Sequence, residues 1–359
     1  MTADLRCLPI EDWPAIDRAV WIAGVQRKGL FDPAGVGANW SDGSRRKTAG
    51  GYGYWLSWLA RRGVCDSNVS PADRVSRERV GAYVAELRVS RAPYTVLCRV
   101  QELYDALRLL APGADWDWLV QIYRTLRTHV RPARDKVSRL RPIDELAALG
   151  ERLMEEAEAA PRWSPRRRAV AYRDGFMIAL LAYRPTRPKN FAMMRLGRHL
   201  TKVGGCWQIL FAADETKSRI PYEATVPSAL VPRLERYLDL HRPVLLRGES
   251  GDVRSDIDAV WVSEIGTPLE KGALARRIAD HTKAAFGRRV SPHMFRDAAA
   301  TSIAVDNPKH IGDASLVLGH AGHRMTEKHY NHARSLEASR RHTEMLKRLR
   351  ETLKSGRNR

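Results

Sequence analysis

The chain has 359 residues, of which 44% are apolar and 28% are charged. At roughly 150 residues per domain, this length indicates about two domains, each with enough apolar residues for a core. The composition excludes a disordered tail, a collagen-like fibre and a disulfide-stapled miniprotein. Sixty-one Lys and Arg residues against 41 Asp and Glu residues give a net charge of +20. This excess predicts a polyanionic partner, because basic side chains that neutralise phosphates release counterions.

The sequence predicts neither a membrane span nor a disulfide framework. The longest apolar runs, such as residues 176–181, fall far short of the ~20 residues that a membrane span needs. The first residues include an early acid and lack the apolar segment of a signal peptide, so we expect a cytoplasmic protein. The four cysteines lie far apart and form no CxxC pair, which favours neither disulfides nor a cysteine-bound zinc ion.

The N-terminal part of the sequence is predicted to be helical. Residues 1–37 form an extension in which apolar residues recur at helical spacing before a stretch that contains Gly and Pro. Residues 38–130 contain four amphipathic segments, which predict a compact four-helix unit. We expect the second of these helices to begin at Ser70, because Ser is a favourable capping residue and Pro71 then falls in the first turn.

Two glycine-rich segments in this half could be mistaken for phosphate-binding loops. They comprise residues 35–37 and 50–53. Neither is followed by the Lys-Ser or Lys-Thr pair that completes such a loop. We therefore expect both segments to form turns.

A strongly basic linker, residues 131–142, leads into the second half of the chain. Residues 143–335 are predicted to form a helical unit with a small antiparallel sheet, because apolar residues alternate at period two in its middle. A basic helix with one apolar face follows at residues 336–359. The predicted helices are residues 144–160, 169–182 and several from 271 onward, and the predicted strands are residues 206–211, 220–226 and 259–262.

Five residues of the second half carry side chains suited to phosphate chemistry. Arg187 lies at a predicted helix start. His293 and Arg296 are three residues apart on a predicted helix, which places an imidazole beside a guanidinium. Two arginines can hold the non-bridging oxygens of a phosphodiester, and their charge matters most when negative charge accumulates there. Tyr330, ten residues after His320, can be a covalent nucleophile if a neighbour takes its proton.

At these residues the sequence resembles the tyrosine recombinases, the phage integrase family. The resemblance covers residues 39–333 and rests mainly on the order and spacing of His293, Arg296, His320 and Tyr330. It implies a mainly α fold, with an N-terminal four-helix, SAM-like core-binding domain. The catalytic domain that follows would be α+β, with a small antiparallel sheet.

The mechanism of that family implies a role for each matching residue. Tyr330 would attack the scissile phosphate and form a 3′-phosphotyrosyl link, while Arg187 and Arg296 hold the non-bridging oxygens. His293 would assist proton transfer from the tyrosine, and His320 would hydrogen-bond the phosphate. Because the link conserves the energy of the broken ester, no cofactor, ATP or metal ion is expected.

Alternatives exist for two of these assignments. Lys217, in the turn between the predicted strands, matches the family's lysine, which acts as general acid on the leaving 5′ oxygen. Lys202 lies before the hairpin and would fill that role in a different register. Arg184 and Arg195 are alternatives to Arg187 as the first arginine.

The sequence departs from the family pattern at three points. Residues 185–186 are Pro-Thr where Gly-Leu is usual, Asn190 stands where an acid is common, and Asp297 stands where histidine is frequent. Every chemical role still has a candidate, so we expect an active enzyme.

The C-terminal region permits two further interpretations. Its histidines at His-x-x-His spacing could suggest a metal site, but no cysteine is near and the acids lack zinc-ligand spacing, so we expect no metal. These histidines are His320, His323, His329 and His332. The helix at 336–359 is either a solvated basic helix or a helix exchanged between protomers.

The sequence therefore predicts a site-specific DNA recombinase that serves integration, excision or transposition of a mobile element. The expected partner is double-stranded DNA with inverted half-sites, bound by a homo-oligomer that forms a tetrameric synapse in the nucleoid. Sister recombinases or DNA-bending accessory proteins are further candidate partners. Two alternatives stay open, namely a type IB topoisomerase that relaxes DNA and a non-cleaving DNA-binding regulator with the same fold.

Overall fold

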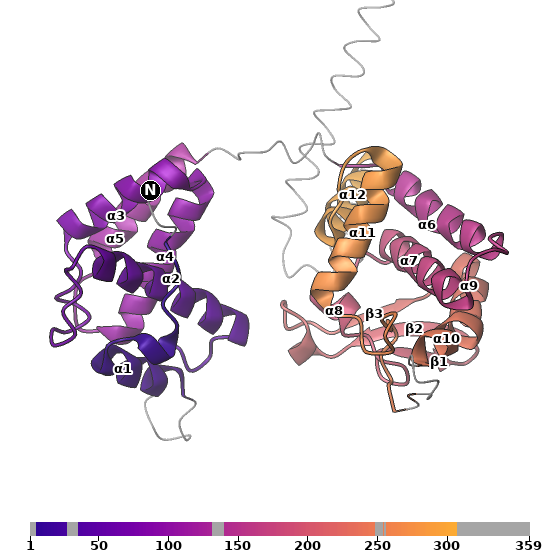
Figure 1. Cartoon of the computed structure of the whole chain (residues 1–359), viewed down its shortest axis with the longest axis horizontal. Coiled ribbons are helices and arrows are strands. Elements are labelled where there is room, and N and C mark those ends of the chain that lie inside the picture. Colours follow the sequence, from indigo (N-terminus) through magenta and orange to yellow (C-terminus); the bar gives the residue numbers. More distant parts are fainter. Residues whose placement is uncertain (1–4, 27–34, 131–139, 248–253, 255, 307–359) are drawn as a thin grey trace, which may run out of the picture. The chain divides into compact units, whose positions relative to one another are not determined.

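The computed structural model describes residues 5–26, 35–130, 140–247, 254 and 256–306. The chain divides into two compact units, Met1–Asp135 and Lys136–Arg359 (Figure 1). Most of the basic linker and the predicted helix at 336–359 lie outside the described residues. Within the described part of the chain, no helix is both long enough and apolar enough to cross a bilayer.

The first unit is a helical bundle. The prediction of four helices is confirmed, and a further helix, α1, precedes them. Trp13 and Trp21, from the predicted extension, are buried in the core of this unit and meet edge to face with ring centroids 5.5 Å apart. Residues 5–26 therefore belong to this core. The elements of the unit are η1 (Ile10–Asp12), α1 (Ala15–Val25), α2 (Asp42–Arg61), α3 (Arg77–Ser90), α4 (Pro93–Leu110) and α5 (Asp117–His129).

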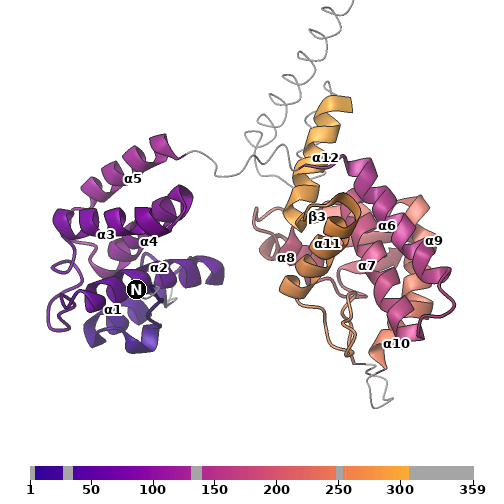
Figure 2. The same ribbon diagram turned by 45° about the horizontal axis from the view of Figure 1, so that its top comes forward.

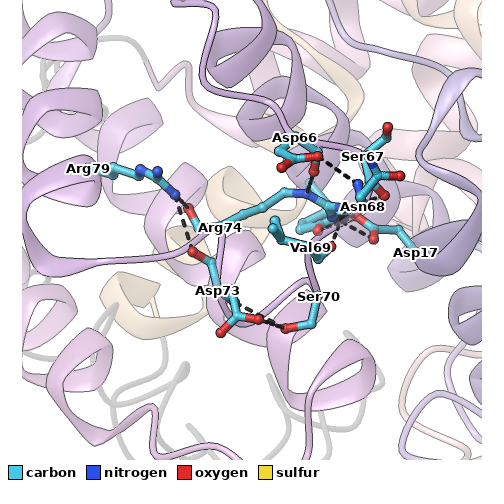
Figure 3. A network of polar contacts seen from close by, with 10 residues as sticks. Asp17, Asp66, Ser67, Asn68, Val69, Ser70, Asp73, Arg74 and Arg79 are labelled. Atoms are coloured by element: carbon cyan, nitrogen blue, oxygen red, sulfur yellow. Dashed lines mark hydrogen bonds and ion pairs between the residues drawn. The ribbon is translucent and has the colours of Figure 1, made fainter.

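A buried ion pair joins α1 to the connection between α2 and α3. Arg74 and Asp17 are both fully buried, and Nη1 of the arginine donates to both carboxylate oxygens at 2.6 Å. Tyr52 of α2 donates its hydroxyl to the same carboxylate at 2.7 Å. Figure 3 shows the Arg74 side chain pointing toward Asp17 and the chain around Asp66 and Val69. Its Nε and Nη2 atoms donate to the carbonyl oxygens of these last two residues at 2.7 and 2.6 Å.

The prediction that Ser70 caps the second helix is wrong. Helix α3 begins at Arg77, and the side chain of Ser76 accepts the capping hydrogen bond from the Arg79 amide. Ser70 instead donates to Asp73 within a preceding turn. Arg74, at the end of this turn, points into the core and donates to Asp17.

The prediction of a turn at residues 50–53 is also wrong, because these residues lie inside α2. The lack of a side chain at Gly51 and Gly53 allows other segments to approach the helix. A Cβ atom on Gly51 would come within 2.2 Å of Glu102 in α4, and one on Gly53 within 2.3 Å of the Leu8 carbonyl oxygen. Close packing against other segments explains why glycine occurs at these positions, and the sequence alone does not show this packing.

The second unit has a helical layer and a small sheet. Helices α6 (Ile143–Glu158) and α7 (Pro165–Tyr183) pack against each other, with α11 (Lys271–Phe286) and α12 (Pro292–Asp306) beside them (Figures 1 and 2). Gly150 and Gly175 lie where the backbones of α6 and α7 touch. A Cβ on Gly150 would come within 2.5 Å of the Ala179 amide nitrogen, and one on Gly175 within 2.7 Å of the Gly150 carbonyl oxygen.

The sheet is antiparallel, with strand order β1-β2-β3. Strand β2 matches the predicted strand at its exact bounds, while β1 was not predicted. The predicted strand at 259–262 is wrong, since its ends make only isolated bridges, from Ala259 to Arg195 and from Val262 to Pro268. Its four apolar residues are buried in the core instead. The strands are β1 (Leu200–Val203), β2 (Cys206–Phe211) and β3 (Tyr222–Thr225).

Short helical segments complete the unit, and two of them, η4 and α10, pack against α7. One of them, η4, is a π-helix that continues without a break from α9 into α10. These segments are α8 (Pro188–Ala192), η2 (Ala213–Glu215), η3 (Ser228–Leu230), α9 (Val231–Arg236), η4 (Tyr237–His241) and α10 (Arg242–Leu246).

Candidate active site

Arg187 is held at the start of α8. Helix α7 ends at Tyr183, an extended connection follows, and Arg187 is the N-cap residue of α8 with Pro188 in the first turn. Proline suits this position because it needs no amide donor and its φ is already helical. The half-buried Arg187 side chain donates from Nη1 to the Ser218 hydroxyl at 3.3 Å.

Arg296 lies in α12 and is buried, with 8% of its surface exposed. Its Nη1 atom donates to the carbonyl oxygen of Pro185 at 2.5 Å. The connection between α7 and α8 therefore holds one arginine through its backbone and carries the other, Arg187, two residues further on.

Without a bound anion, the positive charges of Arg187 and Arg296 repel each other. Burial and, next, the positive charge of Arg187 lower the pKa of Arg296 to about 10. The nearby Tyr222 and Asp297 act in the opposite direction and offset this only in part. Burial also lowers the pKa of Arg187. Both groups remain cationic at neutral pH, so a buried anion with two oxygens would relieve the repulsion between them.

Lys217 lies in the loop between β2 and β3, as predicted, and its side chain is exposed. The next residue, Ser218, is the one that accepts the hydrogen bond from Arg187. The preceding residue, Thr216, is buried and donates its hydroxyl to the Ile220 carbonyl oxygen at 2.7 Å. The fold thus brings the loop of Lys217 to the arginine pair.

The remaining predicted site residues are placed only in part. His293 lies in the first turn of α12, one turn before Arg296, and is exposed. His320 and Tyr330 lie outside the described residues, as do the histidines considered for a metal site. The described structure therefore brings together Arg187, Arg296 and the Lys217 loop, with His293 on the helix that carries Arg296.

The alternative arginines and lysine are engaged elsewhere. Arg184 donates from Nε to the Thr225 carbonyl oxygen at 2.8 Å. Arg195 forms an ion pair with Asp258 at 2.9 Å. Lys202, on β1, forms an ion pair with Glu235 at 2.7 Å. Arg195 and Lys202 are thus paired within other parts of the fold, whereas Arg184, like Arg296, lies near Tyr222. The hydrogen bond from Arg187 to Ser218, the residue after Lys217, favours Arg187 and Lys217 as the site residues.

Sequence reasoning missed several residues around the site. Tyr222, on β3, is half-buried, and burial raises its pKa although Arg184 and Arg296 act against this. Asn190 donates from its side-chain amide to the Glu215 carbonyl oxygen at 3.2 Å. The alternation of residues 220–226 placed Tyr222 on a predicted strand but gave it no role in the site. Asn190 had been noted only as a departure from a pattern, and no sequence signal connects it to Glu215.

Comparisons with solved structures find the same architecture elsewhere. Two crystal structures of XerH site-specific recombinase match, one bound to palindromic difH substrate as a post-cleavage complex and one bound to difH as a pre-cleavage complex. Sequence identities are 15% and 14%, and TM-scores are 0.54 and 0.53. Each match covers 93% of this chain, together with 98% and 99% of the XerH chains. At this level of identity the likeness concerns the fold.

A lambda integrase (75–356) dimer bound to a COC′ core site also matches, with 15% identity and a TM-score of 0.47. That match covers 81% of this chain and 89% of the integrase chain. No curated protein matches the sequence. The sequence model of the phage integrase family matches residues 150–337, which is more than half of the 359 residues. The chain therefore belongs to the phage integrase family, the tyrosine recombinases.

Proposed function

We propose that this protein cuts and rejoins DNA strands at a specific site through a 3′-phosphotyrosyl intermediate. The observation that carries the proposal is the pair of half-buried Arg187 and buried Arg296 beside the loop of Lys217. Two cations held at one place at the cost of a lowered pKa are characteristic of a functional site. The +20 charge of the chain is consistent with a nucleic-acid ligand.

In the proposed reaction, the phenolic oxygen of Tyr330 attacks the scissile phosphorus and loses its proton, with His293 assisting the transfer. The bond between phosphorus and the 5′ oxygen breaks, and Lys217 gives that oxygen a proton. The products are a 3′-phosphotyrosyl enzyme and a free 5′-hydroxyl. Attack on this link by the 5′-hydroxyl of a partner duplex reverses the step and regenerates the tyrosine.

Arg187 and Arg296 contribute through charge and position. The phosphorane gains negative charge on its non-bridging oxygens as the nucleophile approaches, so donors fixed there stabilise the transition state more than the ground state. The third group at the phosphate would be His320. Because Arg296 donates a hydrogen bond to the Pro185 carbonyl oxygen, the guanidinium is already in position before DNA binds.

We further propose that the protein acts on double-stranded DNA as pairs of protomers on inverted half-sites, in a tetrameric synapse. Integration, excision or transposition of a mobile element is the proposed role. The matched XerH structures contain difH substrate before and after cleavage, which supports DNA cleavage by this fold. Sister recombinases and DNA-bending proteins are the accessory partners to test.

Covalent trapping tests the proposal. The purified protein is incubated in EDTA with labelled DNA fragments from both flanks of its own gene, and the reaction is quenched with SDS. We expect an SDS-resistant adduct with the wild type and with Tyr183→Phe, a matched control at an exposed tyrosine, but none with Tyr330→Phe. Sequencing the adducted DNA locates the site.

Other outcomes would redirect the assignment. An adduct that persists with Tyr330→Phe would contradict Tyr330 as the nucleophile. Tight binding without any adduct would favour the non-cleaving regulator. Relaxation of supercoiled DNA without a preferred site would favour the topoisomerase.

A further inference from the structure

We propose that Glu215 is a positioning residue for DNA cleavage, because it fixes the loop that carries Lys217 beside the catalytic arginines. This inference rests on the proposed function, in which Lys217 protonates the leaving 5′ oxygen. It concerns a residue that touches neither DNA nor the reacting atoms and that acts through the backbone of its own loop.

The carboxylate of Glu215 contacts two segments, the residues just before β1 and the residue just after β2. One oxygen, Oε1, accepts a hydrogen bond from His199 Nε2 at 3.0 Å and forms an ion pair with Arg198. The other, Oε2, accepts from the Ala212 amide at 3.0 Å. The side chain is 8% exposed. Burial by itself would raise the pKa of Glu215, but the hydrogen bond from His199 and these other contacts outweigh it and lower the pKa, so the group is ionised at neutral pH.

His199 is oriented for this contact by its own surroundings. The ring is buried, and its Nδ1 atom accepts a hydrogen bond from the Arg195 amide at 3.0 Å. A neutral imidazole that accepts at one nitrogen carries its proton on the other. Nε2 is therefore the donor toward Glu215. The hydrogen bond therefore runs from His199 to Glu215. It joins the start of the loop to the segment before β1.

The backbone of Glu215 is held from a second direction. Its carbonyl oxygen accepts the side-chain amide of Asn190, which lies in α8 three residues after Arg187. The helix that begins with one catalytic arginine thus also holds the loop of the lysine. Between Glu215 and Lys217 there is a single residue, Thr216, whose hydroxyl is bonded across the loop to Ile220.

The conformation of the loop requires such support. Among the described residues other than glycine, Arg219 alone has a positive φ, 57°. This backbone region is unfavourable for a residue with a Cβ and persists where neighbouring contacts impose it. Arg219 directly follows Ser218, the acceptor for Arg187. Lys217 therefore lies two residues after the anchored Glu215 and two residues before the strained Arg219. Without the Glu215 contacts, the loop would relax and Lys217 would lose its position.

A substrate with sulfur in place of the bridging 5′ oxygen tests this inference. A thiolate leaves without a proton, so the sulfur substrate removes the need for a general acid and leaves the need for the arginines. We expect Glu215→Ala to slow single-turnover cleavage of the oxygen substrate by about 10- to 100-fold, as expected for a misplaced catalytic group, with unchanged DNA affinity. On the sulfur substrate its rate should return to within about threefold of the wild type. The probe is the duplex mapped by covalent trapping.

Three variants serve as controls. Lys217→Ala should show the same rescue by sulfur, and Arg187→Ala should show none. Asp214→Ala removes an exposed carboxylate from the same turn, next to Glu215, and should cleave both substrates like the wild type. A second measurement follows amide hydrogen exchange over residues 212–221, which should speed up in Glu215→Ala and not in Asp214→Ala.

The outcomes separate this inference from the proposed function. Wild-type cleavage together with normal cleavage by Glu215→Ala would overturn the inference and leave the function intact. Slow cleavage of both substrates by Glu215→Ala would also overturn it, since the defect would then not pass through the lysine. If the wild type cleaves no DNA, the proposed function fails, and unchanged loop exchange in Glu215→Ala would still refute the anchor.

Discussion

Two buried arginines, one in each unit, show how the same side chain serves different ends. Arg74 lies in the first unit, where Asp17 faces it and backbone carbonyl groups accept its other donors (Figure 3). Burial alone would lower its pKa, but the hydrogen bond and charge of Asp17 raise it above the usual value. Arg296 in the second unit lies near another cation, Arg187, and its pKa is lowered to about 10.

The two environments differ in whether the charge of the arginine is stabilised by the fold itself or would be stabilised only by a bound ligand. Asp17 lies within the fold and stabilises the charge of Arg74 before any ligand arrives. The charge of Arg296 carries a desolvation and repulsion cost that an external phosphate would offset. One arginine therefore stabilises structure, and the other prepares for a ligand. The same substitution, arginine to methionine, should distinguish them because it removes the charge and keeps most of the volume.

Arg74→Met should have the largest effect on stability. It leaves Asp17 as an uncompensated buried charge, which typically costs about 3–5 kcal/mol of unfolding free energy. Hydrogen exchange of α2 in increasing urea would report this loss for the first unit alone. Arg88→Met, at an exposed position of α3, should change the same value by no more than about 0.5 kcal/mol. A loss below about 1 kcal/mol for Arg74→Met would refute the structural role.

Arg296→Met should have its main effect on catalysis. We expect the cleavage rate to fall by about 10²–10³-fold, as for the loss of one preorganised donor to a developing anion. The unfolding free energy of the second unit should stay unchanged or rise, because a buried repulsion is removed. Arg289→Met, at an exposed residue paired with Asp280, is the control and should retain activity. Marked destabilisation by Arg296→Met would remove the contrast with Arg74.

Inorganic phosphate should stabilise the second unit and not the first. Binding to the folded state alone adds RT ln(1 + [L]/Kd), or about 2.7 kcal/mol at a hundredfold excess over Kd. Slower hydrogen exchange in α12 with unchanged exchange in α2 would be the expected pattern. The slowing should be lost in Arg296→Met. Equal stabilisation of both units would mean that phosphate acts by general charge screening.

The two units should also differ in their response to acid, which is the smallest expected effect. Burial raises the pKa of Glu102 in α4, and Arg99 and Lys47 offset this only in part. Its contribution is therefore fully present below the unfolded value near 4.5 and is lost as the pH rises through the folded pKa. Asp174 in α7 behaves oppositely. Burial would raise its pKa, but Arg173, His281 and Arg277 together lower it, so its contribution is present above 3.8 and lost as the pH falls through the folded pKa.

Urea unfolding at a series of pH values from 3 to 7, with hydrogen exchange read separately in α2 and α7, measures this difference. The first unit should lose stability as the pH rises from 4.5 toward 7, and Glu102→Gln should reduce that loss. The change should be smaller than that caused by Arg74→Met. A first unit that gains stability over this interval in the wild type would contradict the assignment for Glu102.

The sequence contained enough information for the helices and for part of the site. Helical periodicity located α2 to α5, because each buries one face. Arg296 was predicted as a site residue from the motif it shares with His293, and Arg187 from its place at a predicted helix start; both assignments stay predictions. The contacts that fix them were not predictable, since they join residues far apart in the chain, as when Arg296 bonds to Pro185.

The missed features share a physical cause. In strand β1 only the first residue is buried, so its sequence shows no alternation, unlike that of β3. The pairing of His199, just before this strand, with Glu215 was therefore missed as well. Likewise, the role of Arg74 depends on Asp17, 57 residues away. The sequence indicated which residues have suitable chemistry. The contacts between residues far apart in the chain could be seen only in the structure.

The contact between α6 and α7 has a consequence for how this protein can diverge during evolution. Gly150 and Gly175 each lie against the backbone of the opposite helix, so neither position has space for a methyl group. A mutation at one cannot be accommodated by a change of side chain at the other, because the obstacle is main chain. Any lineage that lost either glycine would have to part the helices and displace the end of α7, from which Arg187 follows. In close relatives of this protein, neighbouring positions should therefore vary while both glycines are retained.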